Sequence, residues 1–189
     1  AIMKTALVVD DEPLLRRQVA ETLASYGFDK ILEANDGAEA VAAAEQNRPM
    51  LVVMDVTMPV MDGVTAAEKI GKVRSTPIVL LTGNTDRETL DRAREAGVMS
   101  YLVKPFNEDQ LVPAIDLAIH HFIQASTLRE EVAKLEETLE TRKLVERAKA
   151  ALIRQGLSEP EAYRKQQKTA MDKRRSMKEV AEAILLMAE

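Results

Sequence analysis

The chain has 189 residues with 26 basic and 31 acidic side chains, which gives a formal net charge of −5. This length accommodates one large domain, or a domain of about 120 residues followed by a smaller module. Cysteine is absent and histidine occurs twice, which excludes disulfides and thiolate metal sites and provides poorly for histidine-based catalysis. The absence of cysteine makes a reducing cytoplasm the expected setting. No apolar run approaches the ~20 residues that cross a bilayer, so we expect no membrane segment.

Charge is distributed unevenly along the chain. Residues 1–125 carry 12 basic and 19 acidic side chains, whereas residues 126–189 carry 14 and 12. Within 142–178 the basic excess is larger, with 12 basic and 4 acidic side chains. An acidic front and a basic back indicate two modules with different partners.

The first 125 residues alternate between short apolar segments and amphipathic segments. The expected strands are 5–9, 30–34, 50–55, 77–82 and 100–104, and the expected helices are 13–28, 37–48, 63–73, 86–97 and 107–125. Five strands that alternate with five helices predict a doubly wound α/β domain, with a parallel sheet covered on both faces. The run in 50–55 is the most apolar, which favours a central strand.

The segment 126–141 follows without a strand or turn signal. Its apolar residues recur at alternating steps of four and three residues, and they are Leu128, Val132, Leu135 and Leu139. This is the a/d spacing of a coiled coil, although only about two heptads fit before Arg142 falls on the same stripe. Two interpretations stay open: a coiled-coil linker that forms a dimer, and a helix face packed on its own chain.

Three helical segments are expected in the last part of the chain. The long helix continues to a stop at Gly156. Ser158 with Glu161, and Ser176 with Glu179, have the three-residue spacing of a capping box and mark the starts of two more helices. Residues 142–189 are therefore expected to form a small all-α domain.

Polar side chains stand at the ends of four expected strands. Asp10 and Asp11 follow the first strand, Asp55 ends the third, Thr82 ends the fourth and Lys104 ends the fifth. The carboxyl ends of parallel strands meet at one edge of the sheet, where ligands of such folds bind. Clustered carboxylates without histidine or cysteine favour Mg2+, and a hydroxyl with an ammonium group suits phosphoryl oxygens. Asp55 is the expected phosphoryl acceptor, because it ends the most buried strand and stands apart from the acidic pair.

The order and spacing of these residues resemble the receiver domain of two-component response regulators, over residues 4 to about 125. The resemblance rests on Asp10-Asp11, Asp55 with Met58-Pro59 and Asp62-Gly63, Thr82-Gly83, Tyr101 and Lys104-Pro105-Phe106. It implies a flavodoxin-like fold for residues 1–125. It also implies that Asp55 accepts a phosphoryl group from a sensor histidine kinase.

The resemblance also implies a metal site. Asp11 and Asp55 are expected to bind Mg2+ directly, together with the backbone carbonyl of Thr57, whereas Asp10 acts mostly through water. Lys104 is expected to pair with the phosphoryl group.

Switching residues are implied as well. Thr82 is expected to move toward the phosphate and Tyr101 to swing inward, which alters the surface of the fourth helix and fifth strand. Partial core packing is an equal alternative for Tyr101. The bond between Lys104 and Pro105 is expected to be cis.

Basic side chains are concentrated in the expected helical tail. They are Arg142, Lys143, Arg147, Lys149, Arg154, Arg164, Lys165, Lys168, Lys173, Arg174, Arg175 and Lys178. Neutralisation of phosphates by such charges supplies much of the affinity for nucleic acid, although a solvated helical surface also explains charge alone. Tyr163 is the one aromatic residue of the tail, so stacking on unpaired bases has limited means.

The tail resembles the ANTAR domain, a three-helix RNA-binding module of bacterial antitermination regulators, over roughly residues 135–188. The matching residues are Arg142, Glu146-Arg147-Ala148-Lys149, Glu161-Ala162-Tyr163, Ala170-Met171 and Met177-Lys178-Glu179-Val180-Ala181. The resemblance implies binding to paired RNA hairpins near a terminator, with a dimer that presents two modules. The expected RNA contacts are Arg142, Lys149, Tyr163, Arg174 and Arg175.

Two positions depart from the usual ANTAR pattern. Ala150 stands where that family commonly has glycine, and alanine is benign in a helix. Gln166 stands where the family has an apolar residue. We expect Gln166 either to weaken the packing of the second tail helix or to face solvent.

Together these features predict a response regulator that is phosphorylated on Asp55, dimerises through residues 126–145 and binds RNA to prevent transcription termination. Two alternatives would also be controlled by phosphorylation of Asp55. One is a DNA-binding transcriptional regulator, and the other is a phosphorylation-dependent protein-interaction switch. The tail contains no catalytic constellation, so we expect no enzyme activity beyond the receiver's own phosphotransfer and slow hydrolysis.

Overall fold

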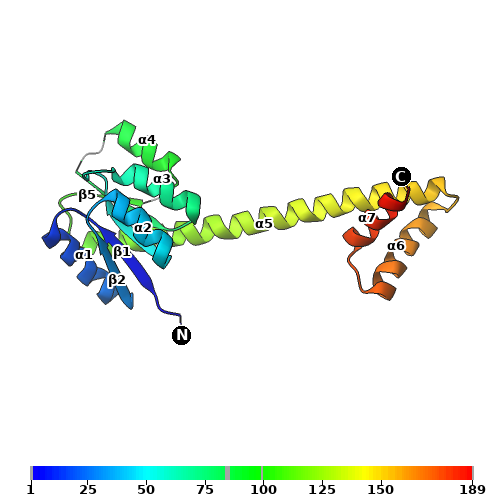
Figure 1. Ribbon diagram of the computed structural model, residues 1–189, viewed down its shortest axis with the longest axis horizontal. Coiled ribbons are helices and arrows are strands. Elements are labelled where there is room, and N and C mark those ends of the chain that lie inside the picture. Colours follow the sequence, from blue (N-terminus) through cyan, green and yellow to red (C-terminus); the bar gives the residue numbers. More distant parts are fainter. Residues whose placement is uncertain (1, 84–85, 99, 189) are drawn as a thin grey trace. The chain divides into compact units, whose positions relative to one another are not determined.

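The structure is a computed structural model that describes residues 2–83, 86–98 and 100–188 (Figure 1). The chain divides into two units, Ala1–Ser126 and Thr127–Glu189. Each unit packs around apolar residues of its own. The two units are therefore described separately.

Five parallel strands form the sheet of the first unit within the described residues. They are β1 (Thr5–Val9), β2 (Lys30–Ala34), β3 (Leu51–Asp55), β4 (Ile78–Thr82) and β5 (Ser100–Val103). Their order across the sheet is β2-β1-β3-β4-β5, and each neighbouring pair is parallel. The order reverses between β1 and β3, which is the point where doubly wound folds bind ligands. The prediction of a doubly wound parallel sheet is confirmed.

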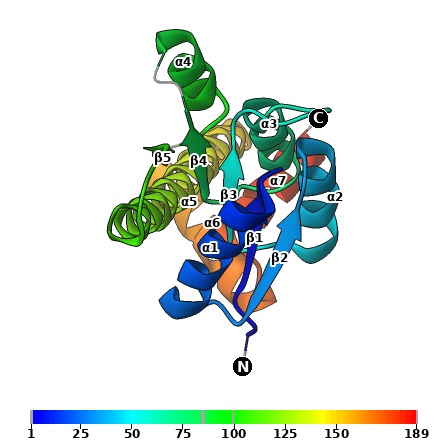
Figure 2. The same ribbon diagram turned by 90° about the vertical axis from the view of Figure 1, so that its left-hand side faces the viewer.

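Helices cover both faces of this sheet (Figure 2). They are α1 (Pro13–Tyr26), α2 (Gly37–Asn47), α3 (Gly63–Val73), α4 (Arg87–Glu95) and the first part of α5 (Glu108–Arg154). Alternate residues of a strand point to opposite faces. In β1, Leu7 and Val9 therefore pack with α2 and α3, while Ala6 and Val8 pack with α1 and α5. Every residue of β3 is buried, as expected for the most apolar strand.

The second unit consists of the end of α5 with α6 (Glu159–Lys173) and α7 (Met177–Ala188). Helix α5 is followed by Gly156, whose φ of 106° is readily adopted only by glycine. The capping box of Ser158 and Glu161 begins α6 as predicted. Ser176 and Glu179 exchange the same pair of hydrogen bonds, at 2.9 and 3.1 Å, before α7. The predicted last residue of this helix, at position 189, lies outside the described residues.

Gln166 is fully buried between α6 and α5. Its Nε2 donates a hydrogen bond to the carbonyl oxygen of Val145 at 3.2 Å. Its Oε1 has no hydrogen-bond partner among the described residues. The alternative in which Gln166 faces solvent is therefore wrong, because α6 turns this residue toward α5.

Helix α5 runs without interruption from Glu108 to Arg154 and belongs to both units. The stripe of Leu128, Val132, Leu135 and Leu139 is 61, 45, 69 and 53 % exposed. These exposures contradict the interpretation in which the stripe packs on its own chain. An exposed a/d stripe is instead typical of a helix whose partner lies on another chain.

Candidate functional site

The register of the sheet gathers the polar strand ends at one edge. Val9 pairs with Met54 and Asp55 pairs with Leu81, so Asp10 and Asp55 end neighbouring strands. On the other side of β3, Thr82 ends β4, and its carbonyl oxygen accepts a hydrogen bond from the Lys104 amide at 2.8 Å. The ends of β1, β3, β4 and β5 therefore lie at one edge of the sheet, as the sequence predicted.

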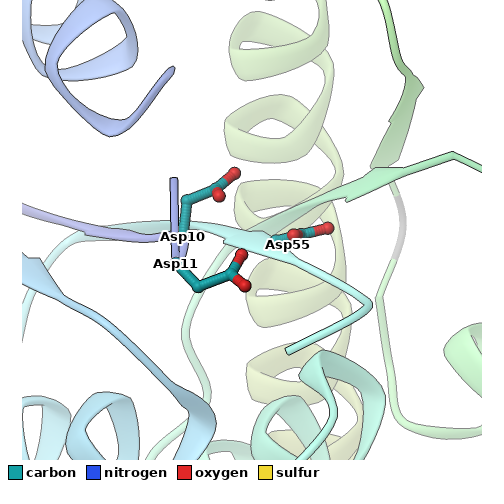
Figure 3. A group of neighbouring side chains, drawn as sticks. All are labelled: Asp10, Asp11 and Asp55. Carbon is teal, nitrogen blue, oxygen red and sulfur yellow. The ribbon is translucent and has the colours of Figure 1, made fainter. Parts of the chain in front are cut away.

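Three carboxylates form the centre of the site (Figure 3). One carboxylate oxygen each from Asp10, Asp11 and Asp55 lies within 4.8 Å of the other two. Asp10 and Asp55 are buried, whereas Asp11 is exposed and its carboxylate is directed toward Asp55. Oxygen ligands without nitrogen or sulfur fit a hard divalent cation such as Mg2+, and the exposure of Asp11 leaves the group open to solvent.

Lys104 holds the two buried carboxylates together. Its Nζ lies 3.1 Å from Oδ2 of Asp10 and 3.2 Å from Oδ2 of Asp55. Burial alone would lower the pKa of Lys104, but the charge of Asp55 and the hydrogen bond to Asp10 outweigh it, so that this pKa lies above 10.5. The ammonium group is therefore charged throughout the physiological range.

The ionised form of Asp55 stays unfavourable despite this partner. Burial raises the pKa of Asp55 above 3.8, and the charge of Lys104 opposes this rise while Asp10 adds to it. The Thr57 amide donates a hydrogen bond to Oδ1 of Asp55 at 3.3 Å, which favours the ionised form only weakly. One ammonium group is thus insufficient for the buried carboxylates. A divalent cation would supply the missing positive charge.

The loop after β3 is closed against Asp55 by Gly63. The Gly63 amide donates to the carbonyl oxygen of Val56 at 2.8 Å. A Cβ at this position would lie 2.1 Å from the backbone oxygen of Asp55, so no other residue fits without a shift of the backbone. This close approach explains the glycine of the Asp62-Gly63 motif.

Asp62 caps α3 and also binds α4. It accepts hydrogen bonds from the Thr65 amide at 2.8 Å and from Arg92 at 3.2 Å. Burial works to raise the pKa of Asp62, but these hydrogen bonds together lower it below 3.8. Asp62 is therefore an ionised link between the loop beside the acidic site and α4.

The expected switching residues occupy different environments. Thr82 is 3 % exposed at the end of β4, and Tyr101 is 49 % exposed on β5. Tyr101 is thus not part of the core in this structure. The peptide bond between Lys104 and Pro105 is cis, as expected.

Arg16 belongs to the site although the sequence did not single it out. Its guanidinium donates hydrogen bonds to the backbone oxygen of Asp10 and to Oδ1 of Asn35, both at 2.8 Å, and lies 3.1 Å from Glu33. A signal was present, because a cation in the first turn of a helix opposes the helix dipole and needs a local partner. Here the partners are the ends of β1 and β2.

The expected RNA contacts of the second unit differ in availability. Arg142, Arg174 and Arg175 are exposed, and Tyr163 is 44 % exposed. Lys149 is 16 % exposed and forms ion pairs with Glu146 at 2.9 Å and Glu159 at 3.0 Å. The hydrogen bonds that the Lys149 ammonium donates to these two carboxylates raise the pKa of Lys149. The positive charge of Lys149 is therefore already neutralised by ion pairs within the unit.

No helix in the described part of the chain is both long and apolar enough to span a membrane.

The fold and the acidic site define the class of this protein. Residues 6–116 match the model of the response regulator receiver domain, and residues 133–185 match that of the ANTAR domain. The chain belongs to the response regulator family, with a receiver domain followed by an ANTAR domain. Its class is that of regulators that act through RNA binding and antitermination.

A relative and two solved structures show the extent of the similarity. The transcriptional regulatory protein PdtaR of Mycobacterium tuberculosis is 49 % identical over 186 residues, which cover 98 % of this chain and 91 % of PdtaR. The chemotaxis protein CheY4 of Vibrio cholerae is 34 % identical with a TM-score of 0.56, covering 61 % of this chain and 98 % of CheY4. The CheX-CheY-BeF3-Mg+2 complex of Borrelia burgdorferi is 25 % identical with a TM-score of 0.56, covering 59 % and 86 %.

Proposed function

We propose that a sensor histidine kinase phosphorylates Asp55 and that this modification controls RNA binding by the tail. The observation that carries the proposal is the approach of three carboxylates within 4.8 Å beside Lys104. In this scheme residues 1–125 form the receiver, residues 126–141 the coiled-coil linker and residues 142–189 the RNA-binding domain. An oxygen of Asp55 attacks the phosphorus of the kinase's phosphohistidine, the P–N bond breaks, and the imidazole leaves with the bonding electron pair.

The site residues divide this work among themselves. Asp11, Asp55 and the backbone carbonyl of Thr57 would hold Mg2+ directly, and Asp10 would hold it mostly through water. When bound, Mg2+ supplies positive charge that neutralises the carboxylates and the incoming phosphoryl oxygens. The presence of Mg2+ and BeF3 in the named Borrelia burgdorferi complex supports this assignment.

Lys104 and Thr82 supply the remaining contacts to the phosphoryl group. The ammonium of Lys104 already lies 3.2 Å from Asp55, so it stands close to any group that this carboxylate accepts. The Thr82 hydroxyl would donate to a second phosphoryl oxygen. Inward movement of Tyr101, which is 49 % exposed, would then change the surface around β5 and α4.

The output is binding of RNA hairpins by a homodimer that phosphorylation favours. Exposure of the α5 stripe supports dimerisation, and the exposed Arg142, Tyr163, Arg174 and Arg175 support contacts with phosphates and bases. Lys149 would contact RNA only after exchange of its glutamate partners. The name of PdtaR, a transcriptional regulatory protein, agrees with control of gene expression.

Phosphorylation of Asp55 is tested with an acyl phosphate donor and Mg2+. Mass spectrometry of the intact wild-type chain should show one added phosphoryl group, and Asp55→Asn should show none because an amide cannot accept it. Asp91→Asn, on the exposed surface of α4, is the matched control and should be phosphorylated normally. Undiminished phosphate incorporation by Asp55→Asn would refute the assignment.

The metal ligand is tested by Mg2+ titration of Asp11→Ala. We expect the Mg2+ dissociation constant to rise by at least tenfold, because a direct carboxylate ligand is lost. Unchanged Mg2+ affinity in Asp11→Ala would remove this residue from the metal site.

The nature of the nucleic acid is tested by comparing hairpin RNA with duplex DNA over a range of salt concentrations. The phosphorylated chain should prefer the hairpins. Preference for the DNA duplex would favour a DNA-binding regulator, and absence of binding to either polymer would favour a protein-interaction switch.

A further inference from the structure

A groove of about 600 Å3 runs between the end of α5, α6 and α7 in the second unit. These three elements lie side by side in Figure 1. Its volume falls in the ~300–1,000 Å3 range of sites for small ligands or single side groups of larger ones. None of Arg142, Lys149, Tyr163 and Arg174 lines it.

The rim of the groove is basic. Lys165 and Lys173 of α6 and Arg175 of the following turn line it, and among the described residues one carboxylate, that of Glu179, lines it as well. That carboxylate is engaged, because its Oε2 accepts the Ser176 amide at 2.9 Å and its Oε1 lies 3.6 Å from Arg175. Lys165 and Lys173 form no ion pair with any described residue, in contrast to Lys149. The rim therefore offers two uncompensated cations to an anionic ligand.

The floor of the groove is apolar. It is formed by Leu152 of α5 and by Val180, Ile184 and Met187 of α7. Leu152 and Val180 are only 3 and 5 % exposed, whereas Met187 is 87 % exposed, so the end of the floor at Met187 is the part that faces solvent. An apolar surface framed by cations suits a ligand that is flat and apolar on its face and anionic at its ends.

We propose that this groove receives an unpaired nucleotide from an RNA loop, with its base on the apolar floor and the flanking phosphates on Lys165 and Lys173. The proposal rests on the RNA-binding function proposed above, and it assigns the contact with the RNA loop to this groove. A paired base has both faces covered by its neighbours in the stack, so only an unpaired base can lie on this floor. Sequence-specific recognition of RNA uses such splayed bases.

Two polar side chains of the groove can read the edge of that base. Gln155 provides an amide with both donors and an acceptor, and Thr169 provides a hydroxyl. The Thr169 hydroxyl donates to the carbonyl oxygen of Lys165 at 2.8 Å, which leaves its oxygen as an acceptor. Gln155 and Thr169 therefore provide for base selection in the same groove.

The test uses the full phosphorylated chain and a pool of synthetic RNA hairpins that share one stem and carry a randomised loop. The probe for comparison is the same stem as a blunt duplex. The hairpins should bind at least tenfold more tightly than the duplex. Lys165→Gln with Lys173→Gln should weaken hairpin binding about tenfold and reduce the salt dependence by about 1.5 in slope. Lys143→Gln with Arg147→Gln removes the same charge from exposed positions outside the groove and should have a smaller effect.

The floor is tested separately with Met187→Ser. The Met187 side chain is exposed, so this substitution should not affect folding. This variant should weaken hairpin binding about fivefold through lost apolar contact and leave the salt slope unchanged. The proposal for the groove would be overturned if the double variant at Lys165 and Lys173 lost no more hairpin affinity than the double variant at Lys143 and Arg147. It would also be overturned if the groove variants lost as much affinity for the blunt duplex as for the hairpins. Complete absence of RNA binding by the wild-type chain would instead overturn the proposed function itself.

A second inference concerns Arg16, whose contacts are independent of the tail. Its side chain is 16 % exposed and joins three parts of the first unit. It donates to the backbone oxygen of Asp10 and to Asn35, and it lies 3.1 Å from Glu33 of β2. The Asp10 carboxylate, in turn, accepts the Glu12 amide at 2.9 Å. The turn that carries Asp10 is therefore held from both its carbonyl and its carboxylate.

The geometry points to Arg16 as a positioning residue for the proposed Mg2+ site. It fixes the backbone between the two acids while contributing no ligand of its own. The planar guanidinium reaches the carbonyl, the amide oxygen and the carboxylate at once, which a lysine ammonium on its flexible stem does not reproduce. Residues that orient metal ligands in this way typically affect metal affinity by tenfold or more.

The readout is the Mg2+ dissociation constant, measured by titration calorimetry on folded protein without a phosphodonor. Arg16→Gln and Arg16→Lys should both raise this constant by about tenfold. Arg17→Gln, at the exposed neighbouring position, should leave it within about twofold.

The opposite signs of two effects make this test decisive. If Arg16 acted only through its positive charge, Arg16→Gln would bind Mg2+ more tightly and Arg16→Lys would bind as the wild type does. If it acted only on global stability, the unfolding midpoint would fall while Mg2+ affinity of the folded protein stayed the same. Either result would overturn the positioning role.

Discussion

Lys104 is the residue on which the charge balance of the acidic site depends. Its ammonium contacts both Asp10 and Asp55, whose side chains are only 1 and 7 % exposed. Lys104→Gln leaves two buried carboxylates without a cation, so the free energy of unfolding at pH 7 should fall by about 2–3 kcal/mol without Mg2+. Saturating Mg2+ should recover part of this loss by replacing the charge.

Urea unfolding with and without Mg2+ measures the effect of Lys104→Gln. The control is Lys72→Gln, because Lys72 pairs with Glu68 at 3.2 Å on the exposed surface of α3. Surface pairs of this kind contribute less than about 1 kcal/mol. An equal loss in the two variants would contradict the central role of Lys104.

Asp55 should make stability depend on pH in a defined direction. Burial raises its pKa in the folded chain above 3.8, so the folded state holds this proton more tightly than the unfolded state. The resulting stabilisation is fully present below pH 3.8 and is lost as the pH rises through the raised pKa. Asp55→Asn cannot ionise, so at pH 7 and without Mg2+ it should be more stable than the wild type.

The comparison of Asp55→Asn with the wild type requires urea unfolding at several pH values between 4 and 8. The stability difference should grow with pH over the range of the raised pKa and then stay constant. A variant less stable than the wild type at pH 7 would show that the ion pair with Lys104 outweighs burial.

Single residues differ in how far the sequence could place them. Asp10, Asp55 and Lys104 were predictable, because parallel strand ends meet at one edge and the alternation of elements located those ends. The contact of Gln166 was not, because its partner is the backbone oxygen of Val145, and Arg16 gave only the weak signal of a cation in a first helical turn, because its contact to Asp10 is also to a backbone oxygen. A contact with a backbone oxygen leaves no complementary side chain in the sequence to reveal it.

At the scale of elements, the packing of α6 on α5 includes an unfavourable contact. Gln166 is fully buried and its Oε1 has no partner among the described residues. A buried acceptor without a partner costs about 1–3 kcal/mol, and one hydrogen bond of its amide returns about 1. Gln166→Leu should therefore raise the free energy of unfolding of the full chain by about 1 kcal/mol.

Gln166→Ala separates polarity from packing at this position. It removes the unpaired oxygen too, but leaves a cavity, so the free energy of unfolding should fall by about 1–2 kcal/mol. Thermal or urea unfolding followed by helical circular dichroism measures both variants. A loss of stability in Gln166→Leu would show that the bond to Val145 is worth more than the unpaired oxygen costs.

Elements as a whole were more predictable than their ends. The strands fall where apolar runs placed them, yet the helix expected over 13–28 ends at Tyr26. Gly27 has a φ of 129° and its amide caps the helix through Leu23. The helix expected over 86–97 likewise is α4, Arg87–Glu95, with Gly97 at a φ of 85°. Periodicity locates a helix, whereas the capping geometry of individual residues decides its last turn.

At the scale of the whole molecule, α5 is the element that both units share. Its first part packs on the sheet through residues such as Leu111 and Ile115, and its last part carries Val145 and Ala148 of the second core. Between them lies the exposed stripe. Pairing of two chains along this stripe would therefore bring two receivers and two tails into one assembly. The same helix would then couple a change in the receiver to the presentation of RNA-binding surfaces.

Leu135→Glu should break this coupling without unfolding the chain. Leu135 is 69 % exposed, so the substitution has little cost in the single chain but places two charges together in a paired seam. Sedimentation of the wild type treated with acyl phosphate should show a dimer, and Leu135→Glu should raise the dimer dissociation constant by at least tenfold. Ala133→Glu, exposed and off the stripe, adds the same charge and should leave that constant unchanged. Phosphorylation should stay complete in all three proteins, because Asp55 lies in the other unit. If Leu135→Glu dimerised with the affinity of the wild type, the dimer interface would lie elsewhere.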